Sequence, residues 1–186
     1  ALVQALATRY PNVTYGETPI RVYGRYTRVA RAIRLGLDYL RYSDERYESM
    51  PKLRQRAYKR APAFVVTLGR LPFRRLVTRF LELVEEAIPP QPGVDEFLAQ
   101  HQPDVLLVTP LIELGSPQLD YVRAARRMRV RSALCVWSWD HLSSKALIRV
   151  PPDKVIVWNE VQRDEAARFH GLPADRVVVT GAQCFD

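Results

Sequence analysis

The second half of the chain alternates short apolar runs with helical stretches, and turn residues separate them. The apolar runs span 104–109, 132–137, 154–158 and 176–180, and each is continuous rather than alternating with polar positions. Continuous apolar runs are typical of strands that are buried on both faces of a parallel sheet. The pattern therefore predicts a βαβ array of four parallel strands.

Helices are predicted between these strands, at about 117–129 and 160–170. The second helix has both ends marked in the sequence. Asn159 is a good N-cap with Gln162 at the third helical position, and Gly171 follows the last residue, His170. Capping explains Asn159 but leaves Glu160 unexplained, so both residues are also candidate substrate-binding groups at the end of a strand.

The first half is predicted to be mainly helical. Its first apolar stripe has spacings of three and four and comprises Val22, Tyr26, Val29, Ile33, Leu37 and Leu40. Residues 51–60 and 72–87 continue as helices, whereas 63–68 fits a strand or a helix equally well. A proline-rich stretch at 88–93 is the one plausible internal boundary, between a helical basic region 1–90 and a βαβ core 103–186. We expect residues 1–186 to form a single Rossmann-like domain, an α/β fold with a doubly wound parallel sheet in three layers.

The chain opens within what looks like the end of a helix, at residues 2–10. A doubly wound domain normally begins with a strand that lies near the ligand crevice. We therefore expect a strand upstream of residue 1; the alternative is a sheet that lacks its usual central strand.

Composition is that of an ordinary globular protein, with 47% hydrophobic and 26% charged residues. The longest uncharged apolar stretch, 61–69, is far too short to span a bilayer, and no signal peptide is recognisable. Two cysteines make no disulfide framework. The expected location is the cytoplasm, with peripheral attachment to the inner face of the membrane as an option.

The basic excess lies entirely in the first half: residues 1–90 hold 17 Lys and Arg against 8 Asp and Glu, and residues 91–186 hold 11 against 12. Such a one-sided charge suits an anionic partner such as lipid head groups, nucleic acid or a phosphorylated substrate. Arginines on two faces beside the apolar stripe are predicted to face an anionic membrane, the alternative being a solvated basic face: Arg21, Arg25 and Arg28 on one face, and Arg31 and Arg34 on the other.

Candidate chemistry lies in the loops that follow the strands, because ligands of open parallel sheets bind at the carboxyl ends of the strands. The richest loop is 138–145. In it, Asp140 and His141 are candidate general bases, Trp139 a platform for a sugar ring, and Lys145 a partner for phosphate. The remaining candidate substrate-binding residues are Thr109, Ser143, Ser144 and Gln183. The alternative is that Asp140 or Ser143 caps a short helix and Lys145 is solvated.

Other signatures are missing from the sequence. It holds neither a P-loop nor a glycine-rich dinucleotide motif, and neither a Gly-x-Ser-x-Gly elbow nor a zinc-ligand spacing, so no metal and no cofactor is expected. His101 and His170 lie near predicted helix C-termini, where a cation complements the helix dipole, and are interpreted as structural.

Five stretches resemble one family when taken in order: 103–110, SWDHLSSK at 138–145, PDKVIVWNEVQRDEA at 152–166, HGLP at 170–173 and RVVVTGAQCFD at 176–186. Together they resemble the N-terminal Rossmann half of bacterial two-domain glycosyltransferases of the GT-B fold, including relatives that build surface carbohydrates. The resemblance is dense over roughly 85 residues and loose over the basic first half.

This resemblance implies a domain that receives a saccharide or lipid-linked acceptor, while a second, C-terminal domain binds the nucleotide-sugar donor. It also implies that the 186 residues alone are inactive as a transferase. Two other classes stay open: a non-catalytic sugar- or nucleotide-binding module, and a basic nucleic-acid-binding protein. Nucleic acid is the less expected partner, because no known recognition module is present.

Overall fold

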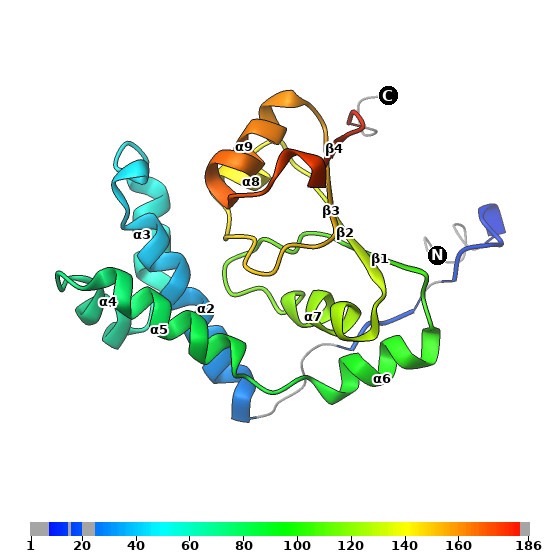
Figure 1. Cartoon of the computed structure of the whole chain (residues 1–186), viewed down its shortest axis with the longest axis horizontal. Helices are drawn as coiled ribbons and strands as arrows, with labels where there is room; N and C mark the ends of the chain where they lie inside the picture. The colour runs from blue at the N-terminus through cyan, green and yellow to red at the C-terminus, as the bar shows by residue number, and fades with distance from the viewer. Residues whose placement is uncertain (1–7, 15, 20–24, 183–186) are drawn as a thin grey trace.

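The computed structural model describes residues 8–14, 16–19 and 25–182, apart from the side chains of Arg25 and Arg46. A helical part and an α/β part lie side by side (Figure 1). The helical part consists of α2 (Arg25–Tyr42), a 3-10 turn (Glu45–Tyr47), α3 (Pro51–Arg60), α4 (Ala63–Gly69) and α5 (Arg74–Glu86). The segment 63–68, which fits a strand or a helix in the sequence, is helical. Helix α6 (Pro92–His101) then leads into the α/β part.

The α/β part contains β1 (Val105–Val108), α7 (Leu119–Met128), β2 (Arg131–Cys135), α8 (His141–Ser144), β3 (Lys154–Val157), α9 (Glu160–His170), a 3-10 turn (Ala174–Arg176) and β4 (Val177–Val179). All four strands are parallel and lie in the order β1-β2-β3-β4. The predicted α/β class, the parallel sheet and the helix-rich first half are confirmed. The order of the described strands across the sheet follows their order in the chain, without the reversal that marks a doubly wound sheet.

One face of the sheet forms the main core. Val108, Leu134 and Val155 point to this face and pack with residues of α7, α8 and α9, among them Val122 and Leu142. Side chains alternate between the two faces of a strand. On the opposite face, three side chains are exposed: Val105 at 51%, Leu107 at 62% and Val178 at 39%. The expectation that the strands are buried on both faces is therefore wrong at these positions, because the described helices pack on the other face.

A second core holds the helical part together. Ile33, Leu37 and Leu40 of α2 pack against Val65 of α4 and residues of α5. Thus the C-terminal half of the predicted stripe is buried. Its N-terminal half is not, since Tyr26 is 40% and Val29 46% exposed, and Val22 lies outside the described residues.

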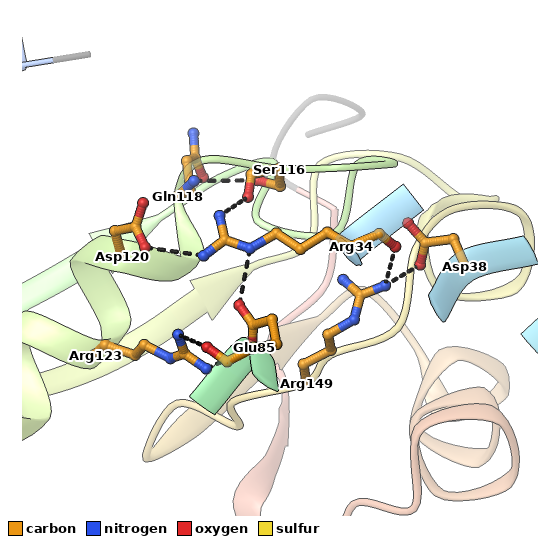
Figure 2. A network of polar contacts seen from close by, with 8 residues as sticks. All are labelled: Arg34, Asp38, Glu85, Ser116, Gln118, Asp120, Arg123 and Arg149. Atoms are coloured by element: carbon orange, nitrogen blue, oxygen red, sulfur yellow. Dashed lines mark hydrogen bonds and ion pairs between the residues drawn. The ribbon is translucent and has the colours of Figure 1, made fainter. Parts of the chain in front are cut away.

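A network of charged side chains joins α2 to both parts of the molecule (Figure 2). Arg34 donates hydrogen bonds of 2.9 Å to the carboxylates of Glu85 and Asp120 and to the carbonyl of Ser116. Arg123 contacts Glu85 as well. On the next turn of α2, Asp38 pairs with Arg149. The described parts are thus tied together through buried ion pairs.

This network corrects one predicted site. Arg34 is only 2% exposed and is engaged by two carboxylates, so it does not face a membrane. Arg28 and Arg31 are exposed, and their membrane role stays a prediction. Arg21 and the side chain of Arg25 lie outside the described residues.

None of the described helices combines the length and the apolarity that crossing a bilayer requires.

Candidate functional site

The segment 136–145 follows β2 at the carboxyl edge of the sheet and carries most of the predicted site. Both tryptophans of this segment are largely exposed, Trp137 at 59% and Trp139 at 76%. Large aromatic side chains are usually buried, because they remove much apolar area from water. Trp137 was not among the residues singled out in the sequence, since it is the last position of an apolar run that predicts a strand.

The Asp140 carboxylate is held at the start of α8. Its two oxygens accept hydrogen bonds from the hydroxyls of Ser138, at 2.6 Å, and Ser144, at 2.7 Å, and Lys145 Nζ lies 3.9 Å away. These hydroxyls, Ser138 first, lower the pKa of Asp140 below its usual 3.8. Asp140 occupies the N-cap position of α8, but its side chain bonds the two serine hydroxyls rather than backbone N–H groups. The carboxylate is therefore ionised at neutral pH and partly accessible.

His141, the second predicted base, lies inside the fold. It is 0% exposed, and its ring meets that of Trp137 edge to face at 6.1 Å between centroids. Burial lowers its pKa to about 4, so the imidazole is neutral at neutral pH. A substrate outside the fold does not reach this ring in the conformation described, and its role as a base stays a prediction.

The start of α9 is built from its own side chains. Asn159 accepts a hydrogen bond of 3.0 Å from the backbone N–H of Gln162, which confirms the predicted N-cap. Glu160 pairs with Arg163 on the exposed face of the helix, which gives a structural account of the residue that capping left unexplained. Substrate binding by Asn159 or Glu160 stays a prediction.

Gln162 links α9 to the 136–145 segment. Its side-chain NH2 donates to the carbonyls of Ser138, at 3.0 Å, and Trp139, at 3.4 Å, while its carbonyl accepts from the N–H of Trp158 at 2.8 Å. Gln162 is 2% exposed. This buried amide therefore fixes the backbone that carries the exposed indole of Trp139.

The helical part holds the other end of the same segment. Tyr42 donates its hydroxyl hydrogen to the carbonyl of Lys145, and Arg41 donates to that carbonyl at 3.3 Å. Arg56 of α3 donates to the carbonyl of Ser144. Burial raises the pKa of Tyr42 to about 12, so it stays a protonated donor. Sequence patterns offered no signal for these contacts, which join residues about a hundred positions apart.

Glu165 of α9 is a titratable neighbour of the segment that the sequence reading missed. Desolvation raises its pKa above the usual 4.5, a hydrogen bond with Ser143 lowers it, and the charge of Asp140 raises it further. Two carboxylates with pKa values shifted in opposite directions are a common acid–base arrangement. The only sequence signal was its position on the helix that begins at a strand end.

His170, at the end of α9, contacts the backbone of α8 and of the loop that follows it. Its Nδ1 accepts from the N–H of Ile148 at 3.1 Å, and its Nε2 lies 2.7 Å from the carbonyl of Leu142. Burial lowers the pKa of His170 to about 3, so this side chain is neutral. The predicted structural role of His170 is confirmed. The prediction that His170 acts as a cation at the helix end is wrong, because burial keeps its imidazole neutral.

A cavity of about 620 Å³ lies between α2 and α5 on one side and the α/β part on the other. Arginines dominate its lining: Arg41, Arg74, Arg75, Arg79, Arg123 and Arg149, with Asp44, Glu82, Glu85 and Glu86 as the acidic residues. Glu85 and Asp38 engage Arg123 and Arg149. Arg75, which is exposed, and Arg41, bound to neutral groups, are the cations best placed for an incoming anion.

The remaining predicted site residues are not brought together. Thr109 is exposed after β1, and its carbonyl accepts from the side chain of Gln118 at 2.9 Å. Gln183 lies outside the described residues. Within the described chain, no group of His, Cys, Asp and Glu side chains could hold a metal ion.

No family model, no curated protein and no solved structure matches this chain, so a functional assignment depends on the side chains gathered at the carboxyl edge of its sheet.

Proposed function

We propose that the chain is the acceptor-side part of a glycosyltransferase that moves a sugar from a nucleotide-sugar to a cell-surface carbohydrate or a lipid-linked acceptor. One observation carries the proposal: the indoles of Trp137 and Trp139 are exposed beside the ionised Asp140 at the carboxyl edge of a parallel sheet. Indoles offer flat apolar faces to the C–H groups of sugar rings, and a carboxylate accepts hydrogen bonds from sugar hydroxyls.

In the proposed reaction, Asp140 accepts the proton of the acceptor hydroxyl. The oxygen of that hydroxyl bonds to the anomeric carbon of the donor. The bond from that carbon to the nucleotide phosphate breaks, and the phosphate keeps the electron pair. The Asp140 side chain is 29% exposed, and Lys145 is 3.9 Å from it, where its charge suits an anionic group. The donor itself would bind a second domain outside these 186 residues.

The arginine-lined cavity supports an anionic acceptor. Six arginines against four acidic residues leave a net positive lining, which suits the phosphate groups of a lipid-linked saccharide. A neutral glycan has no anionic group to pair with this positive charge.

Binding to an immobilised glycan panel tests the proposal, with Trp139→Ala and Trp139→Phe as a matched pair. Stacking on an aromatic face predicts that Trp139→Ala loses at least tenfold in affinity, whereas Trp139→Phe keeps most of it. Uridine diphosphate glucose should bind only weakly in calorimetric titration. Micromolar binding of that nucleotide-sugar, or salt-sensitive binding of mixed DNA with no glycan binding, would contradict the acceptor-side assignment.

A further inference from the structure

The hairpin formed by α4 and α5 carries large apolar side chains on its outer surface. We define the hairpin face by these residues, each between 38% and 71% exposed: Phe64, Leu68, Leu71, Phe73, Leu76, Phe80 and Leu83. Single exposed apolar residues are normal on proteins, but seven within twenty positions of one helical hairpin is a concentration that favours an interaction surface. In Figure 1, α4 and the start of α5 lie at the left edge of the molecule, away from the sheet.

Helix α5 has two apolar stripes that serve different purposes. Val77 and Leu81 are buried against α2 in the core of the helical part. Leu76, Phe80 and Leu83 follow one another at spacings of four and three, which places them together on a stripe beside the buried one. Leu76 is 71% and Phe80 65% exposed. The inner stripe packs in the core of the helical part, and the outer stripe is exposed and available to a partner.

The charge around this face is one-sided. Residues 51–80 contain nine Lys and Arg and no Asp or Glu. Most of these cations are exposed, namely Lys52, Arg54, Lys59, Arg60, Arg70, Arg75 and Arg79. Acidic residues of the hairpin occur only at the C-terminal end of α5, where Glu82 pairs with Arg79 and Glu86 is exposed. An apolar surface whose remaining rim is cationic is typical of helices that lie in the interface of an anionic bilayer, with Phe and Leu among the acyl chains and Lys and Arg at the phosphates.

The same charge argues against other occupants. In a symmetric dimer built on this face, the cations of one copy would lie near those of the other. The acidic residues that could compensate are confined to the end of α5, where Glu85 is buried and Glu82 already pairs with Arg79. Charge complementarity therefore selects anionic lipid.

We propose that the hairpin face docks on an anionic lipid bilayer and lies within its interface without crossing it. This docking surface, on the α4–α5 hairpin, is distinct from the arginines of α2, of which Arg34 is buried. The apolar residues of the hairpin face belong neither to the 136–145 segment nor to the lining of the arginine-rich cavity, whereas Arg75 and Arg79 also line that cavity. Variants of the apolar residues therefore test this proposal separately from the proposed function.

Co-sedimentation of the full chain with vesicles tests the proposal. We expect binding to vesicles that contain phosphatidylglycerol and little binding to vesicles of phosphatidylcholine alone. The double variant Leu76→Ser, Phe80→Ser should lower the partition coefficient by about tenfold or more, because two apolar side chains no longer enter the bilayer. The matched control is Val161→Ser on α9, whose side chain is 66% exposed and whose loss should change nothing.

Charge variants give a second readout that does not involve the apolar residues. Arg70→Glu with Arg75→Glu should weaken binding at least tenfold at low salt and by less at high salt, because salt screens surface charge. Arg176→Glu, an exposed arginine of the α/β part, is the matched control. All substituted residues are exposed, so melting temperatures monitored by circular dichroism should stay close to wild type.

Several results would overturn the proposal. One is wild-type chain that fails to co-sediment with phosphatidylglycerol vesicles; another is unchanged binding by folded Leu76→Ser, Phe80→Ser protein. If the serine variant does not fold, unchanged binding by the Arg70→Glu, Arg75→Glu variant overturns it. If the serine variant instead turns a dimer into a monomer in light scattering and keeps its vesicle binding, the face is an interface between copies.

Discussion

Arg34 and Asp120 are 86 positions apart in the chain, and their side chains meet at 2.9 Å across the boundary between the helical and α/β parts. Glu85 closes the group at the same distance from the other side of the guanidinium. All three side chains are at least nine-tenths buried. Removing one partner of a buried ion pair leaves the other charge buried without a counter-charge or water to compensate it.

Removing the central charge should therefore be costly. Arg34→Met keeps most of the side-chain volume but leaves Glu85 and Asp120 buried without their shared cation. We expect it to lower the free energy of unfolding by about 3–5 kcal/mol, measured by urea denaturation. Arg31→Met, one turn earlier and exposed, should cost no more than about 0.5 kcal/mol. Equal stability of the two variants would mean that the network is not formed.

The stability of the protein should fall with acid because two histidines are buried in neutral form. The pKa of His141 is lowered to about 4 and that of His170 to about 3, whereas both titrate near 6.5 when unfolded. Between pH 6.5 and 4 the unfolded chain binds more protons, so each histidine removes about 1.4 kcal/mol of stability per pH unit as the pH falls.

Comparison of variants isolates this effect, because Asp38 and Glu165 have raised pKa values and act in the opposite direction. His170→Gln should be less stable than wild type at pH 7.5 but should lose less stability between pH 6.5 and 5. Urea denaturation at several pH values provides both numbers. An unchanged slope would show that His170 is not buried as described.

Gln162 should be required for the conformation of the 136–145 segment. Gln162→Glu replaces an NH2 that donates to the carbonyls of Ser138 and Trp139 with a carboxylate that can only accept. We expect a loss of about 2–3 kcal/mol and faster hydrogen exchange in the segment. Glu160→Gln, which breaks only an exposed ion pair, is the control and should cost about 0.5 kcal/mol or less. Unaltered exchange in the Gln162 variant would contradict the link.

Asp140→Asn tests the proposed base in an assay of the full-length enzyme. Loss of the proton acceptor should lower turnover about 100-fold. The structure adds a cost in stability of about 1–3 kcal/mol, because the NH2 group of asparagine donates at a position where a carboxylate oxygen accepts a hydrogen bond from a serine hydroxyl. Glu165→Gln is the comparison and should retain turnover within about tenfold, since one of its oxygens is buried.

The pH profile distinguishes the two carboxylates. With Asp140 as the base, kcat/KM should fall only at a pH below the usual aspartate pKa of 3.8, because hydrogen bonds from Ser138 and Ser144 lower the pKa of Asp140. A fall that begins above pH 4.5, together with a larger loss in Glu165→Gln, would transfer the role to Glu165, whose pKa is raised.

Local patterns in the sequence determined the secondary structure and the fold class. The continuous apolar runs marked all four strands, and Asn159, Gln162 and Gly171 marked the two ends of α9, because capping bonds and periodic burial act between near neighbours. The loop after β2 was also identifiable, since a carboxyl edge follows from the βαβ order alone.

The tertiary structure decided which of these residues are reachable and what they contact. Arg28, Arg31 and Arg34 look alike in the sequence, yet only Arg34 is buried, because Glu85 and Asp120 approach it from distant segments. His141 and Asp140 are adjacent, and one is enclosed while the other is partly exposed. Burial and partners depend on contacts between residues far apart in the chain, and periodicity does not encode those contacts.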